Sequence, residues 1–79
     1  MKKHEVKIKP KWFQDVIDNK KSFELRFNDR DYKEGDELYL REWDDCYTTR
    51  KATFRIKYIL ENVDGLETGY CLLGLEPLL

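Results

Sequence analysis

Three charged residues at a fixed spacing are the first candidates for chemistry. Lys21, Glu24 and Arg26 lie within six residues of one another. Residues two apart on a strand project from one face, so the Glu24 carboxylate and the Arg26 guanidinium are expected side by side. An arginine fork matches a phosphate or a base edge, whereas a glutamate accepts from an exocyclic amine or orients the arginine. The spacing therefore predicts a polar recognition cluster; the alternative is a surface ion-pair ladder contributing about 0–1 kcal/mol.

Further candidates for ligand contact follow this cluster in the chain. Arg30 lies in the loop-like segment 28–31 and is a candidate phosphate contact. The alternative is a turn whose Asn and Asp side chains satisfy local backbone groups. Arg41 and Trp43 share one face of a later predicted strand. Trp43 either stacks on a base, an interaction of about 1–3 kcal/mol, or covers the rim of the fold.

The cysteines and the histidine form no recognisable metal or nucleophile motif. Cys46 and Cys71 lack C-x-x-C spacing, and His4 alone leaves too few ligands for zinc. His4 does not lie at a spacing from either cysteine that would indicate a nucleophile–base pair. We therefore expect no metal and no cofactor, with Cys71 in the core and Cys46 in a loop.

The N-terminal residues do not resemble a secretory signal, because Met1-Lys2-Lys3 is followed by His4-Glu5 rather than by an apolar stretch. No apolar run approaches the roughly 20 residues that span a bilayer. The sequence thus predicts a cytoplasmic protein with reduced thiols and no membrane partner.

The chain has many charged residues, but its positive and negative charges almost cancel. Charged residues make up 39% of the 79-residue chain, and the net charge is −1. This balance argues against a general polyanion binder, which carries a basic excess. Residues 1–30 hold nine Lys/Arg against five Asp/Glu, whereas residues 31–49 hold two against seven. The two segments either polarise the surface or pair with each other.

Hydropathy patterns predict five short strands and one helix. Alternating polar and apolar side chains indicate strands, and apolar residues recur at helical spacing after Pro10. The helix is expected to end near Asn19, because asparagine tolerates the left-handed conformation. The predicted strands cover residues 5–9, 22–27, 37–43, 52–60 and 69–75, with the helix after the first of them and a hairpin connection at 46–49.

These elements predict a single domain over residues 1–79. The expected class is α+β and mostly β: a small antiparallel β-barrel of about five strands, since closing a sheet removes its exposed edges. The last strand, Gly69–Leu75, is apolar on both faces and is expected to be central or barrel-closing. Most of the aromatic side chains are expected to fill the core, and Gly69 and Gly74 to mark bends.

The cluster also resembles a family signature. Lys21, Glu24 and Arg26 match the K, E and R of the ASCH pattern G-x-K-x-x-E-x-R, with Asn19 in place of the usual glycine. The runs Lys21–Asp31 and Gly35–Trp43 are similar to short bacterial and phage ASCH-like domains of unknown function. The resemblance covers nearly the whole chain and implies a PUA-like barrel.

What the resemblance implies for function is RNA or nucleotide binding in a cleft beside the helix. The signature residues Lys21, Glu24 and Arg26 would line this cleft, with Arg30, Arg41 and Trp43 as further contacts.

Two other interpretations remain open. Some small ASCH proteins resemble amidohydrolases of N4-acylated cytidine, which keep the signature Lys but carry Thr in place of the signature Glu. Glu24 departs from that pattern, so an enzyme with Lys21 and Glu24 as catalytic residues is the alternative rather than the leading hypothesis. A third interpretation is a protein-interaction domain, for which Leu78-Leu79 is the sequence feature.

Overall fold

Five strands and one helix make up the computed structural model, which describes residues 1–78. Leu79, the second residue of the Leu78-Leu79 pair, lies outside the described residues. The predicted number and order of elements are confirmed. The elements are β1 (Lys3–Ile8), α1 (Pro10–Ile17), β2 (Phe23–Phe27), β3 (Glu37–Trp43), β4 (Tyr47–Glu61) and β5 (Tyr70–Pro77).

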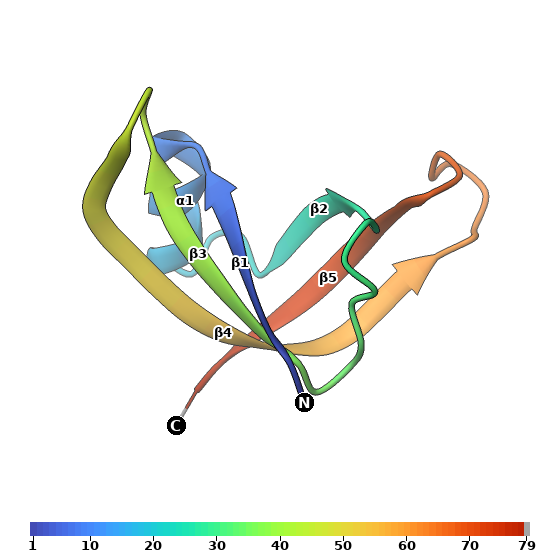
Figure 1. The fold of residues 1–79 in the computed structure, drawn as a ribbon. Helices are drawn as coiled ribbons and strands as arrows, with labels where there is room; N and C mark the ends of the chain where they lie inside the picture. The colour runs from blue at the N-terminus through green and yellow to red at the C-terminus, as the bar shows by residue number, and fades with distance from the viewer. Residues whose placement is uncertain (79) are drawn as a thin grey trace.

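The strands form one sheet in the order β1-β3-β4-β5-β2, which curls into a half-barrel (Figure 1). In the figure, β1 and β3 follow one arm of this trough, and β5 and β2 follow the other. The mostly β class is confirmed. One pairing differs from the antiparallel expectation, because β1 and β3 run parallel. The chain passes through α1 and β2 between these two strands, and a crossover of that length returns it in the same direction.

β4 is the strand that joins the two arms. It pairs with β3 along its first part and with β5 along its second. β4 begins at Tyr47, five residues before the predicted start at Ala52. A tight turn containing Asp45, with φ 61°, reverses the chain immediately after β3, so pairing with β3 begins earlier than predicted. A register shift between Ile56 and Tyr58 lies beside Gly74, one of the two predicted bend positions.

The core lies on the inner face of the trough. Leu38, Leu40, Ile56, Cys71 and Leu73 are fully buried there. α1 adds Phe13 and Val16 to this core. β5 lies between β4 and β2, as its two apolar faces predicted, and buries every second side chain from Cys71 to Leu75.

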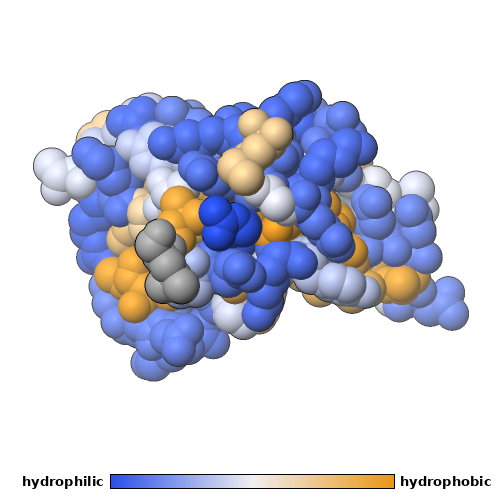
Figure 2. Space-filling view, turned by 90° about the horizontal axis from the view of Figure 1, so that it is seen from below, coloured by the Kyte–Doolittle hydropathy of each residue, from blue (hydrophilic) through white to orange (hydrophobic). Residues whose placement is uncertain are grey.

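β2 has its polar side chains inside and its apolar side chains outside. Glu24 is 6% exposed, whereas Phe23, Leu25 and Phe27 are 45%, 53% and 53% exposed. The expectation that most aromatic side chains fill the core is therefore wrong: Phe13 and Tyr32 are buried, but five others are exposed. The exposed aromatic residues are Trp12, Phe23, Phe27, Tyr47 and Tyr58. Elsewhere hydrophilic residues dominate, and the face in Figure 2 shows hydrophobic residues only in separate patches.

Candidate ligand-binding site

The end of α1 places Lys21 next to β2. α1 ends at Ile17, and Asn19 follows with φ 60°, the left-handed conformation expected from the sequence. The backbone amides of Lys20 and Lys21 then both donate to the Asp15 carbonyl, at 2.9 and 3.0 Å. This turn fixes the direction in which the chain leaves the helix.

The pairing of β2 with β5 places Glu24 and Arg26 on the inner face. Glu24 lies opposite Leu73, and Arg26 lies opposite Cys71. Leu73 and Cys71 are both fully buried, so the alternation along β2 points the two polar side chains into the trough.

Lys21, Glu24 and Arg26 form one hydrogen-bonded cluster, as their spacing predicted. The Lys21 ammonium donates to Glu24 Oε1 at 2.5 Å and to the Phe23 carbonyl at 2.8 Å. Arg26 Nε donates to Glu24 Oε2 at 3.1 Å, and its Nη2 donates to the Lys7 carbonyl of β1. Both oxygens of Glu24 therefore have a cationic partner, and one N–H of Lys21 is left for another acceptor.

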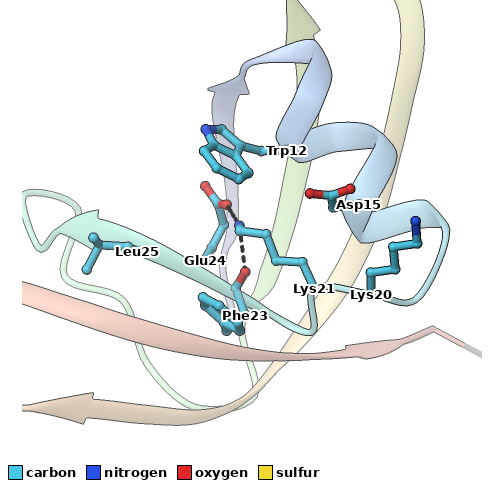
Figure 3. A pocket seen from close by; sticks show the side chains of 7 residues that line it. All are labelled: Trp12, Asp15, Lys20, Lys21, Phe23, Glu24 and Leu25. Atoms are coloured by element: carbon cyan, nitrogen blue, oxygen red, sulfur yellow. Dashed lines mark hydrogen bonds and ion pairs between the residues drawn. The ribbon is translucent and has the colours of Figure 1, made fainter.

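An open cavity of about 560 Å³ lies between α1 and β2, beside this cluster. Its volume falls in the range of small-molecule sites. In Figure 3 the Trp12 ring lies over Glu24 and the Lys21 ammonium, and Lys20 points away from them. The lining residues are Trp12, Asp15, Lys20, Lys21, Phe23, Glu24 and Leu25.

Trp12, Phe23 and Leu25 are cavity residues that the sequence reasoning did not identify. The general expectation for the aromatic side chains was packing in the core, but Trp12 is 43% exposed. Successive side chains of a helix are rotated by about 100° around the helix axis. Trp12 and Ile17 therefore each point about 70° away from the direction midway between the buried Phe13 and Val16. Both are correspondingly half-exposed, so the helical period is the signal that identifies Trp12.

The cluster carries one more cation than carboxylates, and the Asp15 carboxylate also lines the cavity, so the site favours a strongly polar ligand. Two cations share one carboxylate, whose side chain is only 8% exposed. Lys21 is 15% exposed and Arg26 is 25% exposed, so water screens these charges less than it screens surface charges. Within residues 1–78, no three His, Cys, Asp or Glu side chains lie close enough together to hold a metal ion.

Arg30, Arg41 and Trp43 do not join the cavity. Arg30 is half-exposed and lies 4.0 Å from Asp29. The neighbouring Asn28 side chain accepts from the Tyr32 amide at 3.2 Å, as the turn interpretation of this segment predicted. Arg41 and Trp43 lie on the outer face of β3, because Leu38 and Leu40 occupy its inner face.

A buried pair of titratable residues lies elsewhere on the inner face. His4 Nε2 and Asp36 Oδ2 are 2.8 Å apart, and both residues are buried. The edge of the His4 ring packs against Tyr32, and burial raises the pKa of the Tyr32 phenol. The Tyr32 hydroxyl has no hydrogen-bond partner among the described residues.

Comparison with known proteins identifies related sequences. The family described as "Domain of unknown function (DUF3850)" matches residues 3–75. A protein of Escherichia phage P2, described as "Uncharacterized 12.9 kDa protein in GpA 3'region", is 44% identical over 65 residues. The alignment covers 81% of this chain and 60% of the phage protein, so this chain spans about 60% of that relative's length. Among residues 1–78, no helix has the length and apolar character that crossing a bilayer requires.

Proposed function

This chain belongs to the DUF3850 family, and we propose from its own geometry that it is a binding module for RNA or a nucleotide. The base would enter the cavity between α1 and β2. The observation that carries the proposal is the Lys21–Glu24 pair at the wall of an aromatic-lined cavity of about 560 Å³.

The aromatic and charged residues at the cavity have different roles in the proposed binding. Trp12 and Phe23 offer aromatic surface to a base, because every base has a π-face. The remaining N–H of Lys21 donates to a base acceptor or a phosphate oxygen. Arg26 lies beside the cavity and holds Glu24 through Nε, so its role is to position that carboxylate.

We extend the proposal to family relationship and location. The half-barrel, the helix after the first strand and the clustered Lys21, Glu24 and Arg26 support a relationship to ASCH domains of the PUA-like class. A cytoplasmic location would give such a module access to RNA.

The test is a fluorescence-anisotropy titration with labelled short single-stranded RNA at low and high salt. Lys21→Ala is expected to weaken binding by about 10- to 150-fold, because it removes a charged hydrogen bond of about 1.5–3 kcal/mol. Lys57→Ala is the matched control, because it removes the same charge from an exposed side chain that does not line the cavity. Urea denaturation of each variant separates lost binding from lost folding. Equal affinities for wild type and Lys21→Ala at equal stability would contradict the proposal.

A hydrolase is the second candidate, and the pairing of the Lys21 ammonium with the Glu24 carboxylate at an open cavity is the observation that favours it. The reaction would add one water to the amide of an N4-acylated cytidine and release cytidine and a carboxylic acid. Lys21 uses two N–H groups as donors, so its role would be to stabilise the oxyanion. Incubation with N4-acetylcytidine, followed by chromatography, tests this candidate. Absence of cytidine after prolonged incubation would remove it.

A further inference from the structure

The outer face of β1, β3 and the start of β4 gathers cations and aromatic rings. The side chains alternate along each strand, so these residues lie on the face opposite the core. We call this surface the cation–aromatic face; it comprises Lys3, Glu5, Lys7, Glu37, Tyr39, Arg41, Trp43, Tyr47, Lys51 and Arg55.

The cations of this face lie over the rings. Lys3 Nζ is 4.7 Å from the centre of the Tyr39 ring, and Lys7 Nζ is 3.8 Å from that of Trp43. The Arg41 guanidinium is 3.7 Å from the Tyr47 ring. Trp43 and Tyr47 meet edge to face, with their ring centres 4.9 Å apart. The rings and cations are thus neighbours across three strands.

The face carries an excess of positive charge on a chain whose net charge is −1. Arg41 pairs with Glu5 at 3.0 Å. Over the part of the chain that the structure describes, Lys3, Lys7 and Lys51 have no carboxylate within 4.0 Å. Glu37 lies opposite both Lys3 and Arg55 on this face. Five cations therefore accompany two carboxylates, and Lys3, Lys7 and Lys51 are available to an anionic partner.

This combination fits single-stranded nucleic acid. Such ligands bind where cations follow the phosphates and aromatic rings stack on bases. An acidic protein segment would contact the lysines, but it has no base to stack on the rings. A nucleic acid strand uses both.

The cation–aromatic face and the cavity meet at Lys7. Its backbone carbonyl accepts from Arg26, which holds Glu24 at the cavity. Its side chain lies over Trp43 on the outer face. A strand with one base in the cavity therefore has a path across the edge of β1 onto the cation–aromatic face.

We propose that the cation–aromatic face holds the nucleotides next to the base that occupies the cavity. The inference rests on the proposed function, and it names the ligand as a single-stranded oligonucleotide rather than a free nucleotide. Lys7 and Lys51 contact phosphates, and Trp43 stacks on a base.

The two tryptophans of the chain allow each surface to be followed separately, because Trp12 lines the cavity and Trp43 lies on the cation–aromatic face. Trp43→Phe leaves Trp12 as the fluorophore, and Trp12→Phe leaves Trp43. A nucleoside monophosphate is expected to quench Trp12 alone. A short single-stranded RNA is expected to quench both.

A charge comparison completes the test. Lys7→Gln/Lys51→Gln is expected to weaken RNA binding about tenfold and to lower the slope of log affinity against log salt by about 1.4, without changing mononucleotide binding. Lys33→Gln/Lys57→Gln removes the same charge elsewhere on the surface and is expected to have a smaller effect. Equal losses in the two double variants would overturn the inference.

The remaining outcomes separate this inference from the proposed function. RNA that quenches Trp12 but not Trp43 overturns the inference and leaves the proposed function standing. RNA and mononucleotide that quench neither tryptophan overturn both. Quenching of Trp43 by polyglutamate but not by RNA would assign the face to an acidic protein and overturn the inference.

Discussion

At the scale of single residues, Asp36 couples the fold to pH. It is buried and accepts hydrogen bonds from the Lys2 amide at 3.0 Å, from His4 Nε2 at 2.8 Å and from the Lys33 amide at 3.2 Å. Burial by itself raises the pKa of Asp36. The hydrogen bonds outweigh that effect, and the pKa of Asp36 is lowered below its ordinary value of 3.8.

A lowered pKa in the folded state means that the ionised form of Asp36 stabilises the fold. This contribution is complete above pH 3.8 and is lost as the pH falls through the folded pKa. We therefore expect Asp36→Asn to lower the free energy of unfolding at neutral pH and to reduce its decline in acid. Urea denaturation from neutral pH to about pH 3 measures both effects. Asp45→Asn, in an exposed turn, is the control. The same acid dependence for wild type and Asp36→Asn would contradict this account.

At the scale of elements, the loop that enters β5 depends on a close contact at Gly69. Gly69 has φ +91°, and an added Cβ would lie 2.5 Å from the Phe27 ring. That ring packs edge to face on Tyr70 at 5.4 Å. Gly65 has a similar φ of +89° but open space around it, which makes it a matched control.

Alanine at either glycine incurs the cost of the left-handed backbone, about 1–2 kcal/mol. Gly69→Ala must also displace the Phe27 ring from Tyr70, an aromatic pair contributing about 0.5–1.5 kcal/mol. We therefore expect Gly69→Ala to lower the free energy of unfolding by about 1 kcal/mol more than Gly65→Ala. Chemical denaturation of the two variants measures the difference. Equal losses would indicate that the ring moves without cost.

The order and type of the elements followed from sequence patterns because each has a local cause. Alternating side chains predicted β1, β2 and β3, and Pro10 and Asn19 indicated the limits of the helical segment. Alternation along β2 also predicted that Glu24 and Arg26 share a face. It could not predict that this face is the inner one, because the hydrogen bonds that satisfy Glu24 come from Lys21 and Arg26 in the folded chain.

The cavity was less predictable than the cluster beside it. Trp12 and Leu25 meet there only after α1 packs on the sheet, and the sequence gives no distance between them. The alternation along β3 places Arg41 and Trp43 on one face and Leu38 and Leu40 on the other. Alternation alone does not show which of the two faces the candidate site lies on. The place of Arg41 and Trp43 on the outer face is a result of the sheet topology.

At the scale of the whole molecule, Arg26 joins the two ends of the strand order. β1 and β2 are the first and last strands of the sheet, and Arg26 Nη2 of β2 donates to the Lys7 carbonyl of β1. This contact holds the two arms of the half-barrel together across the side where their backbones are not paired in the described sheet.

Replacing Arg26 should therefore loosen both edges. We expect Arg26→Gln to lower the free energy of unfolding by about 1–2 kcal/mol, because it removes charged hydrogen bonds that the sheet ladder does not replace. Amide hydrogen exchange should accelerate most in β1 and β2. Arg41→Gln, which removes an exposed pair with Glu5, should change exchange little. A uniform acceleration over all strands would show that Arg26 acts on global stability alone.

The continuity of β4 has a mechanical consequence. Phe54, Arg55 and Ile56 pair with the β3 side and with β5 at once, so this short stretch belongs to both arms. A change in the angle between the arms must bend these residues or break the Arg26 contact with Lys7. The half-barrel can therefore open only by bending at these three residues of β4. Their stiffness limits how far the two arms can separate once the Arg26 hydrogen bond to Lys7 is broken.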